Sequence, residues 1–183
     1  MSISRYFEDL NKAYRAELED LQTDSEGKNV LAKRLSQKRS QFAELMPMIE
    51  FAPEMVAPVF HGAITFVEPK ALLLLSFAEP EDFPAWAELA QAVRFEAWAQ
   101  KLVAVALLEA GGERFLITMI GLEFLHAKAT ERSTVLRDTG ADADEAGEAE
   151  EHGDGERADD GDEQDLDEAG ADWMAEQGFD RRG

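Results

Sequence analysis

The chain of 183 residues contains no cysteine. Disulfide bonds and thiolate catalysis are therefore excluded, and we expect a reducing, cytoplasmic environment. Long uncharged apolar runs are also missing: Arg94, Glu96 and Lys101 interrupt the apolar stretch 84–110. A membrane span needs about 20 nearly uncharged residues. The first residues lack the basic and apolar segments of a secretory signal, so we expect no membrane association.

Catalytic motifs are scarce. The chain has three histidines, His61, His126 and His152, no G-x-S-x-G sequence, and no lysine in the Gly-rich stretch 111–114 that a phosphate loop requires. Glu123 and His126 have the Glu-x-x-His spacing of di-iron helix bundles, but a second such pair is absent from the sequence. We therefore interpret His61 as structural and predict no catalytic residue, metal or cofactor, and a protein that is not an enzyme.

Charge is unevenly distributed along the chain, whose formal net charge is −21. Residues 1–137 hold 15 Lys and Arg against 20 Asp and Glu, whereas residues 138–183 hold 3 against 19. An acidic excess of this size disfavours binding of the whole protein to nucleic acid or anionic membranes and favours basic protein partners.

Two amphipathic helices are predicted at the N-terminus. Over residues 3–21 the apolar side chains recur at three- and four-residue steps, with Ser4 as a suitable N-cap. A second helix is expected over residues 29–46. The short polar link between them predicts a helical hairpin.

The second helix carries a cluster of cations: Lys33, Arg34, Lys38 and Arg39. Such a cluster is most often a solvated helix face. The functional interpretation is a docking patch for an anionic group, which includes the acidic part of this same chain.

Residues 46–60 are apolar but contain Pro47, Pro53 and Pro58, so they cannot form one regular helix. Met46, Met48 and Met55 make the stretch adaptable. We expect it to wrap the core, and a partner groove is the alternative.

Short apolar segments after Gly62 predict a small antiparallel sheet. Residues 63–67 and 71–77 are expected as strands around a turn, with a third strand over 113–120. Leucine-rich runs also suit helices. In the alternative, residues 113–130 form one helix and the domain is all-α.

Residues 84–110 favour one long central helix, because Pro84 suits a first turn and Gly111-Gly112 a helix stop. Their apolar side chains fall on two nearly opposite sides, which is typical of a central helix. The predicted fold is a single α+β domain over residues 1–137, consisting of a helical hairpin, a small antiparallel sheet and this long helix.

Residues 138–183 are rich in Asp, Glu, Gly and Ala and predict a disordered acidic tail, since such a chain buries too little apolar surface to fold. Four large apolar residues stand near its end: Leu166, Trp173, Met174 and Phe179. Aromatic anchors flanked by acids are typical of short interaction motifs. We therefore predict that these four residues contact a partner, with folding back on the same chain as the alternative.

The sequence as a whole predicts a regulatory or adaptor protein whose acidic tail engages a basic protein. The alternative is an acidic nucleic-acid mimic that blocks a DNA- or RNA-binding protein. The partner, pathway and oligomeric state are not determined by these patterns.

Overall fold

The first helix, α1 (Arg5–Gln22), follows the predicted amphipathic pattern. The computed structural model describes residues 2–24, 26 and 29–140. The hydroxyl of Ser4 accepts a hydrogen bond from the N–H of Phe7 at 3.3 Å, which confirms the predicted N-cap. The apolar stripe faces the core through Phe7, Tyr14, Leu18 and Leu21.

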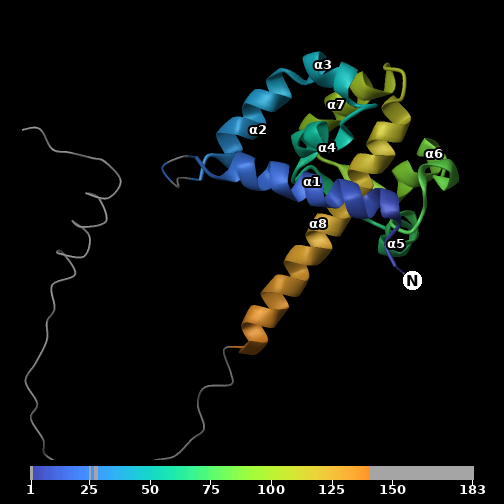
Figure 1. Ribbon diagram of the computed structural model, residues 1–183. Helices are drawn as coiled ribbons and strands as arrows, with labels where there is room; N and C mark the ends of the chain where they lie inside the picture. The colour runs from blue at the N-terminus through green and yellow to red at the C-terminus, as the bar shows by residue number, and fades with distance from the viewer. Residues whose placement is uncertain (1, 25, 27–28, 141–183) are drawn as a thin grey trace, which may run out of the picture. The chain divides into compact units, whose positions relative to one another are not determined.

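The second predicted helix is divided in two. It consists of α2 (Leu31–Ser40) and α3 (Phe42–Leu45), with the break at Gln41. Helices α1 and α2 follow one another in the chain. Helix α2 leaves the end of α1 at a steep angle, whereas in the predicted hairpin it would run back along α1 (Figure 1). Arg34 holds this corner by donating hydrogen bonds to the carbonyls of Asp20 and Thr23 at the end of α1.

The predicted long helix over residues 84–110 is wrong. This stretch contains α6 (Trp86–Leu89), the 3-10 helix η4 (Ala90–Ala92), β2 (Val93–Phe95) and α7 (Ala97–Leu107). Strand β2 pairs antiparallel with β1 (Ile64–Phe66). The N–H groups of Val67 and Glu68 both donate to the carbonyl of Ala92, at 2.8 and 3.0 Å. These hydrogen bonds to β1 and the residues after it replace the ones that a continuous helix would make at residues 92–95. The two apolar sides predicted for one helix over residues 84–110 therefore belong to different elements.

Two predicted strands are also wrong. Residues 71–77 lie mostly in α5 (Pro69–Leu75), and residues 113–120 open α8 (Gly112–Gly140). The alternative that residues 113–130 form one helix is confirmed. Residues 115–125 of α8 are buried on every side of the helix, so its apolar residues show no helical period. The described residues are therefore mostly helical, with one small two-stranded antiparallel sheet.

The proline-rich stretch covers the core as predicted. It contains η1 (Met46–Met48), α4 (Pro53–Val56) and η2 (Ala57–Phe60). Within residues 56–60, four side chains are fully buried: Val56, Ala57, Val59 and Phe60. A further 3-10 helix, η3 (Pro80–Asp82), leads from α5 toward α6.

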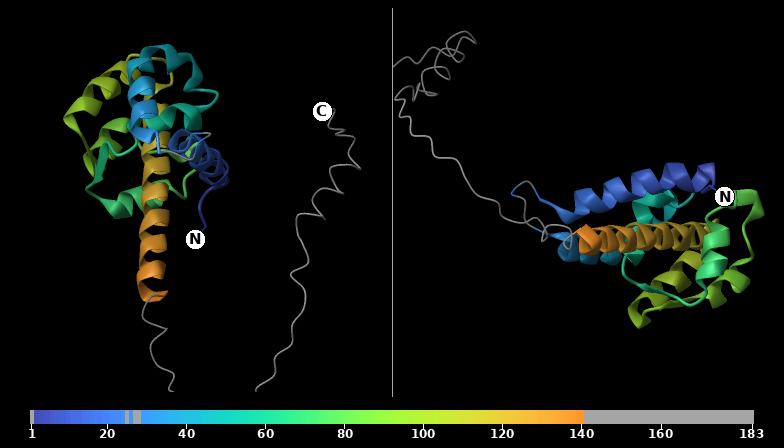
Figure 2. Two further views of the ribbon diagram at one scale, coloured as in Figure 1. Left: turned by 90° about the vertical axis from the view of Figure 1, so that its left-hand side faces the viewer. Right: turned by 90° about the horizontal axis from the view of Figure 1, so that it is seen from below.

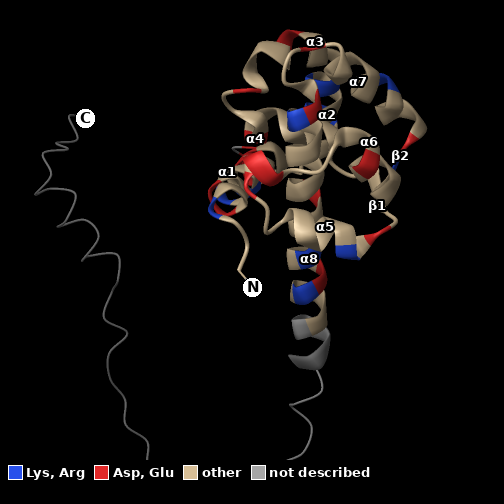
Figure 3. Cartoon of the chain, turned by 90° about the vertical axis from the view of Figure 1, so that its right-hand side faces the viewer, with Lys and Arg blue, Asp and Glu red and all other residues tan. Residues whose placement is uncertain are grey.

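Helix α8 occupies the central position that the sequence suggested for residues 84–110. Helix α1 lies along one side of it, and β1, β2, α5, α6 and α7 lie on the other (Figure 2). The later part of α8 projects beyond these elements, with charges of both signs along it (Figure 3). The predicted domain boundary after residue 137 falls inside α8, and the rest of the predicted acidic tail lies outside the described residues.

Helix α1 packs closely against α8 at Gly121. A Cβ atom added there would lie 2.3 Å from Cε1 of Phe7, whose side chain is fully buried between α1 and α8. Glycine is required at this helical position because it lets the Phe7 ring reach the backbone.

We expect Gly121→Ala to destabilise the protein, although alanine is favoured over glycine by about 1 kcal/mol within a helix. Overpacking costs about 1–3 kcal/mol, and this cost should dominate because the Phe7 ring has no space to move. Thermal and urea unfolding followed by circular dichroism would measure the change. Adding Phe7→Leu should recover part of the loss; a Gly121→Ala protein more stable than the wild type would contradict this packing.

Candidate functional site

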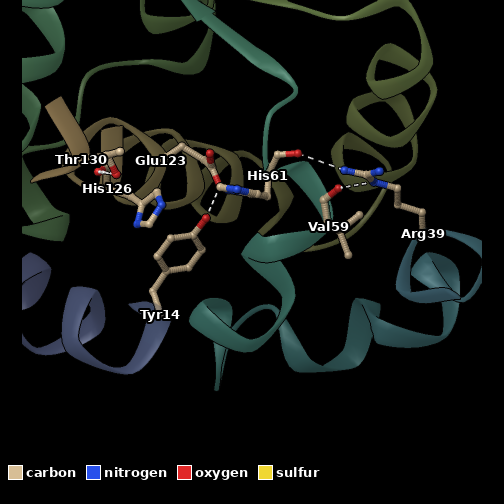
Figure 4. Close-up of polar contacts among 7 residues, drawn as sticks. All are labelled: Tyr14, Arg39, Val59, His61, Glu123, His126 and Thr130. Carbon is tan, nitrogen blue, oxygen red and sulfur yellow. Dashed lines mark hydrogen bonds and ion pairs between the residues drawn. The ribbon is translucent and has the colours of Figure 1, made fainter. Parts of the chain in front are cut away.

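Four polar side chains from distant parts of the chain meet beside α8, and we name them the polar cluster: Tyr14, His61, Glu123 and His126. Tyr14 comes from the middle of α1, and His61 follows η2 directly. Glu123 and His126 stand one turn apart on α8. Figure 4 shows the four side chains directed toward one another.

Glu123 is the centre of the polar cluster and is only 6% exposed. Its Oε1 accepts a hydrogen bond from the hydroxyl of Tyr14, and Nδ1 of His61 lies 3.3 Å from the same oxygen. Burial, and then the negative charge of Glu123, raise the pKa of Tyr14 far above its ordinary value. Tyr14 therefore keeps its proton and acts as the donor to the carboxylate.

His126 completes the polar cluster through its ring. Its centroid lies 5.4 Å from that of His61 and 6.0 Å from that of Tyr14, both edge to face. Burial lowers the pKa of His126, as do the neighbouring His61 and Arg15, while Glu123 acts in the opposite direction. Its Nδ1 is buried without a hydrogen-bond partner among the described residues. The balance favours a neutral imidazole.

Arg39 fixes the same region from the opposite side. Its Nε donates to the carbonyl of Val59 and its guanidinium donates to the carbonyl of His61, both at 2.9 Å. The guanidinium lies 4.0 Å above the ring of Trp98, a favourable cation–π arrangement. His61 is thus held between Arg39 and Glu123 (Figure 4).

The polar cluster opens on a groove of about 440 Å³ between β1 and the later part of α8. Ile64 and Phe66 form one wall, and Thr130 and Thr134 belong to the other. The hydroxyl of Thr130 donates to the carbonyl of His126 within α8. A carboxylate that orients an imidazole is a pairing that can hold and transfer a proton.

The Glu-x-x-His pair seen in the sequence does belong to this cluster, together with His61. Within residues 2–24, 26 and 29–140, however, no group of three or more His, Cys, Asp or Glu side chains is placed to hold a metal ion. The geometry therefore supports a hydrogen-bonded cluster that fastens α1, α8 and the residues after η2 together.

The predicted basic docking patch lies on α2, but its members have different surroundings. Lys33 is exposed. Lys38 donates to Glu17 at 2.5 Å and to the carbonyl of Met55 at 2.9 Å. Arg34 and Arg39 bind backbone carbonyls, as described above. Docking of an anionic group on this patch stays a prediction, and three of its four cations already make contacts within the fold.

The predicted partner-binding residues Leu166, Trp173, Met174 and Phe179 lie outside the described residues. Their role therefore also stays a prediction.

A second candidate site is a group of exposed apolar side chains. We name Met48, Phe51, Leu107 and Leu108 the contact surface. Phe51 is 87% exposed and Leu108 is 86% exposed, and the other two are each more than a third exposed. Met48 and Phe51 belong to the apolar stretch 46–60, for which the sequence offers a partner groove as the alternative to wrapping the core. Leu107 and Leu108 lie in the stretch 84–110, which the sequence predicts as a central helix.

Two turns bring the contact surface together. Leu107 and Leu108 end α7 and lead into Gly111, whose φ of +77° favours glycine. The Glu50 carboxylate packs so closely that a Cβ atom at Gly111 would lie 2.8 Å from its Oε1. Phe51 and Gly111 line the same cavity, of about 200 Å³. The contact surface therefore lies around the junction of the turn after η1 and the turn before α8.

Comparison with known proteins gives no relative: no family model matches the chain, and neither does any curated protein or solved structure. Among the helices in the described part of the chain, none combines the length and the apolar character needed to cross a bilayer.

Removal of the Tyr14 hydroxyl should destabilise the fold, because it leaves the buried carboxylate of Glu123 without its donor. We expect Tyr14→Phe to lower the free energy of unfolding by about 1.5–3 kcal/mol, the range for hydrogen bonds to charged groups. Tyr6→Phe is the matched control: its hydroxyl pairs with the neutral Oγ1 of Thr118 at 3.0 Å and should cost about 0.5–1.5 kcal/mol. Urea unfolding would compare them, and equal losses would contradict a special role for Glu123.

The lowered pKa of His126 predicts a dependence of stability on pH. The unfolded chain takes up this proton near the ordinary pKa of about 6.5, before the folded protein does. His126 therefore costs no stability above that pH, and stability is lost as the pH falls below it. We expect His126→Gln to flatten this part of the curve, measured by urea unfolding between pH 4.5 and 8. An unchanged pH profile would show that His126 is not responsible.

Proposed function

We propose that this chain is a non-enzymatic interaction protein with two binding regions. The folded residues dock a partner protein through the contact surface, and the acidic residues 138–183 engage a basic partner. The exposure of Phe51 and Leu108 carries the proposal, at 87% and 86%.

Large apolar side chains that are isolated on a surface need no explanation, but several of them exposed near one cavity are typical of a binding site. Phe51 lines the cavity of about 200 Å³, and Met48, Leu107 and Leu108 lie within four residues in sequence of its lining residues Glu50 and Gly111. Full burial of a Phe or Leu side chain contributes about 1.5–3 kcal/mol. Phe51 and Leu108 gain little of this free energy within the described residues, so burial by a partner would supply it. The group includes Met48, whose flexible side chain can adapt to a partner.

The acidic residues 138–183 would act mainly by raising the association rate and by selecting which partner binds. Its 19 Asp and Glu against 3 Lys and Arg attract a basic surface from a distance and repel an acidic one. Leu166, Trp173, Met174 and Phe179 would then provide the specific contacts, with an aromatic ring as the anchor.

A nucleic-acid mimic is the second candidate, favoured by the concentration of acids in residues 138–183. A mimic would compete with DNA or RNA for the basic groove of its target. Competition between nucleic acid and this protein for a captured partner separates the mimic from the adaptor, because only the mimic is displaced by nucleic acid.

The proposal predicts that polar substitution of the contact surface abolishes one interaction and leaves the fold intact. Full-length Phe51→Ser/Leu108→Ser should retain wild-type circular dichroism and lose at least one partner about tenfold in quantitative affinity capture. Full-length Trp173→Ala/Phe179→Ala should lose an acidic-segment partner.

Leu73 and Leu74 of α5 provide the matched control. They are 48% and 65% exposed and lie outside the contact surface. Leu73→Ser/Leu74→Ser should leave capture unchanged. Capture that is equal for all four proteins would contradict both binding regions.

A further inference from the structure

The cavity beside the contact surface is suited to one apolar side chain. Its volume of about 200 Å³ is comparable to the cavity of about 150 Å³ that holds benzene in an engineered protein. Leu10, Ile49 and Phe115 supply apolar lining, and Phe51 stands at the exposed side. A leucine, methionine or phenylalanine side chain from another molecule is of suitable size and polarity.

Two of the polar side chains that line this cavity are paired with each other. The hydroxyl of Tyr6 and Oγ1 of Thr118 are hydrogen-bonded to each other at 3.0 Å. An apolar side chain that enters therefore leaves this pair intact, whereas a polar side chain would have to compete with it.

Acidic residues outnumber cations in the lining of the cavity and in the residues next to it in sequence. Glu50 belongs to its lining, and Glu109 and Glu113 are exposed on either side of Gly111. Arg114 is the one cation among the described residues that line it. The local charge therefore complements a basic segment and opposes an acidic one. A second copy of this chain, with its net charge of −21, is disfavoured for the same reason.

We infer that this cavity binds a basic segment of a partner protein, with one apolar side chain in the cavity and flanking Lys or Arg side chains opposite Glu50, Glu109 and Glu113. This inference rests on the proposed function and specifies the chemistry of the partner at the contact surface. Charges in direct contact act within the screening distance of about 8–10 Å at physiological salt, so Glu50 in the lining contributes to the selection.

Three capped synthetic peptides test the inference on the ¹⁵N-labelled full-length protein: Lys-Lys-Leu-Lys-Lys, Lys-Lys-Ser-Lys-Lys and Glu-Glu-Leu-Glu-Glu. We expect the first peptide to shift the amides of residues 49–52 and 109–115 in a saturable way. The serine peptide should shift them at least fivefold less at equal concentration, and the acidic peptide should not shift them. Both basic peptides are also attracted by the acidic residues 138–183, so the informative quantity is the difference between the two peptides in the shifts of the cavity amides.

Two variants test whether the peptide binds at the cavity. Glu50→Gln removes one acid and should weaken binding of the leucine peptide severalfold. Leu10→Phe should fill the cavity, so that the leucine and serine peptides cause equal shifts of the cavity amides. Equal shifts of the cavity amides by the leucine and serine peptides, or equal binding of the acidic peptide, would overturn the inference.

The outcomes also separate this inference from the proposed function. If Phe51→Ser/Leu108→Ser loses a cellular partner while the peptides do not distinguish the cavity, the interaction function stands and the basic apolar segment is wrong. If the peptides bind as expected while every variant captures the same partners, the cavity chemistry stands and the proposed function is wrong.

Discussion

The buried carboxylate of Glu123 is the constraint on which the arrangement of the helices depends. A charged group removed from water costs several kcal/mol unless hydrogen bonds replace its hydration. Tyr14 of α1 and His61 after η2 lie against the same oxygen of Glu123. One side chain of α8 therefore fixes the positions of two segments that are distant in sequence.

Arg39 extends this constraint toward the surface. It binds the carbonyls of Val59 and His61 and stacks on Trp98 of α7. The start of α7 is thereby held close to the residues at the end of η2. At the other end of α7, Gly111 lets the Glu50 side chain approach the turn that leads into α8, and the contact surface lies beside this turn.

The two proposed binding regions select the same kind of partner by different means. Glu50 lines the cavity, and the exposed Glu109 and Glu113 stand two residues before and after its lining residue Gly111. Residues 138–183 carry most of the net charge of −21, which acts on encounter. In this proposal, a basic protein with an exposed apolar side chain suits both regions.

The sequence by itself determined the features that depend on neighbours along the chain: α1 with its Ser4 cap, the wrapping role of residues 46–60, and the charge division near residue 137. Tertiary structure decided the rest. Val93–Phe95 is a strand because Ile64–Phe66 offers hydrogen bonds to it, and α8 lacks a helical pattern because its residues 115–125 are buried on every side of the helix. Likewise, Tyr14, His61 and Glu123 are separated by up to 109 residues, so only folding brings together the donors that a buried carboxylate requires.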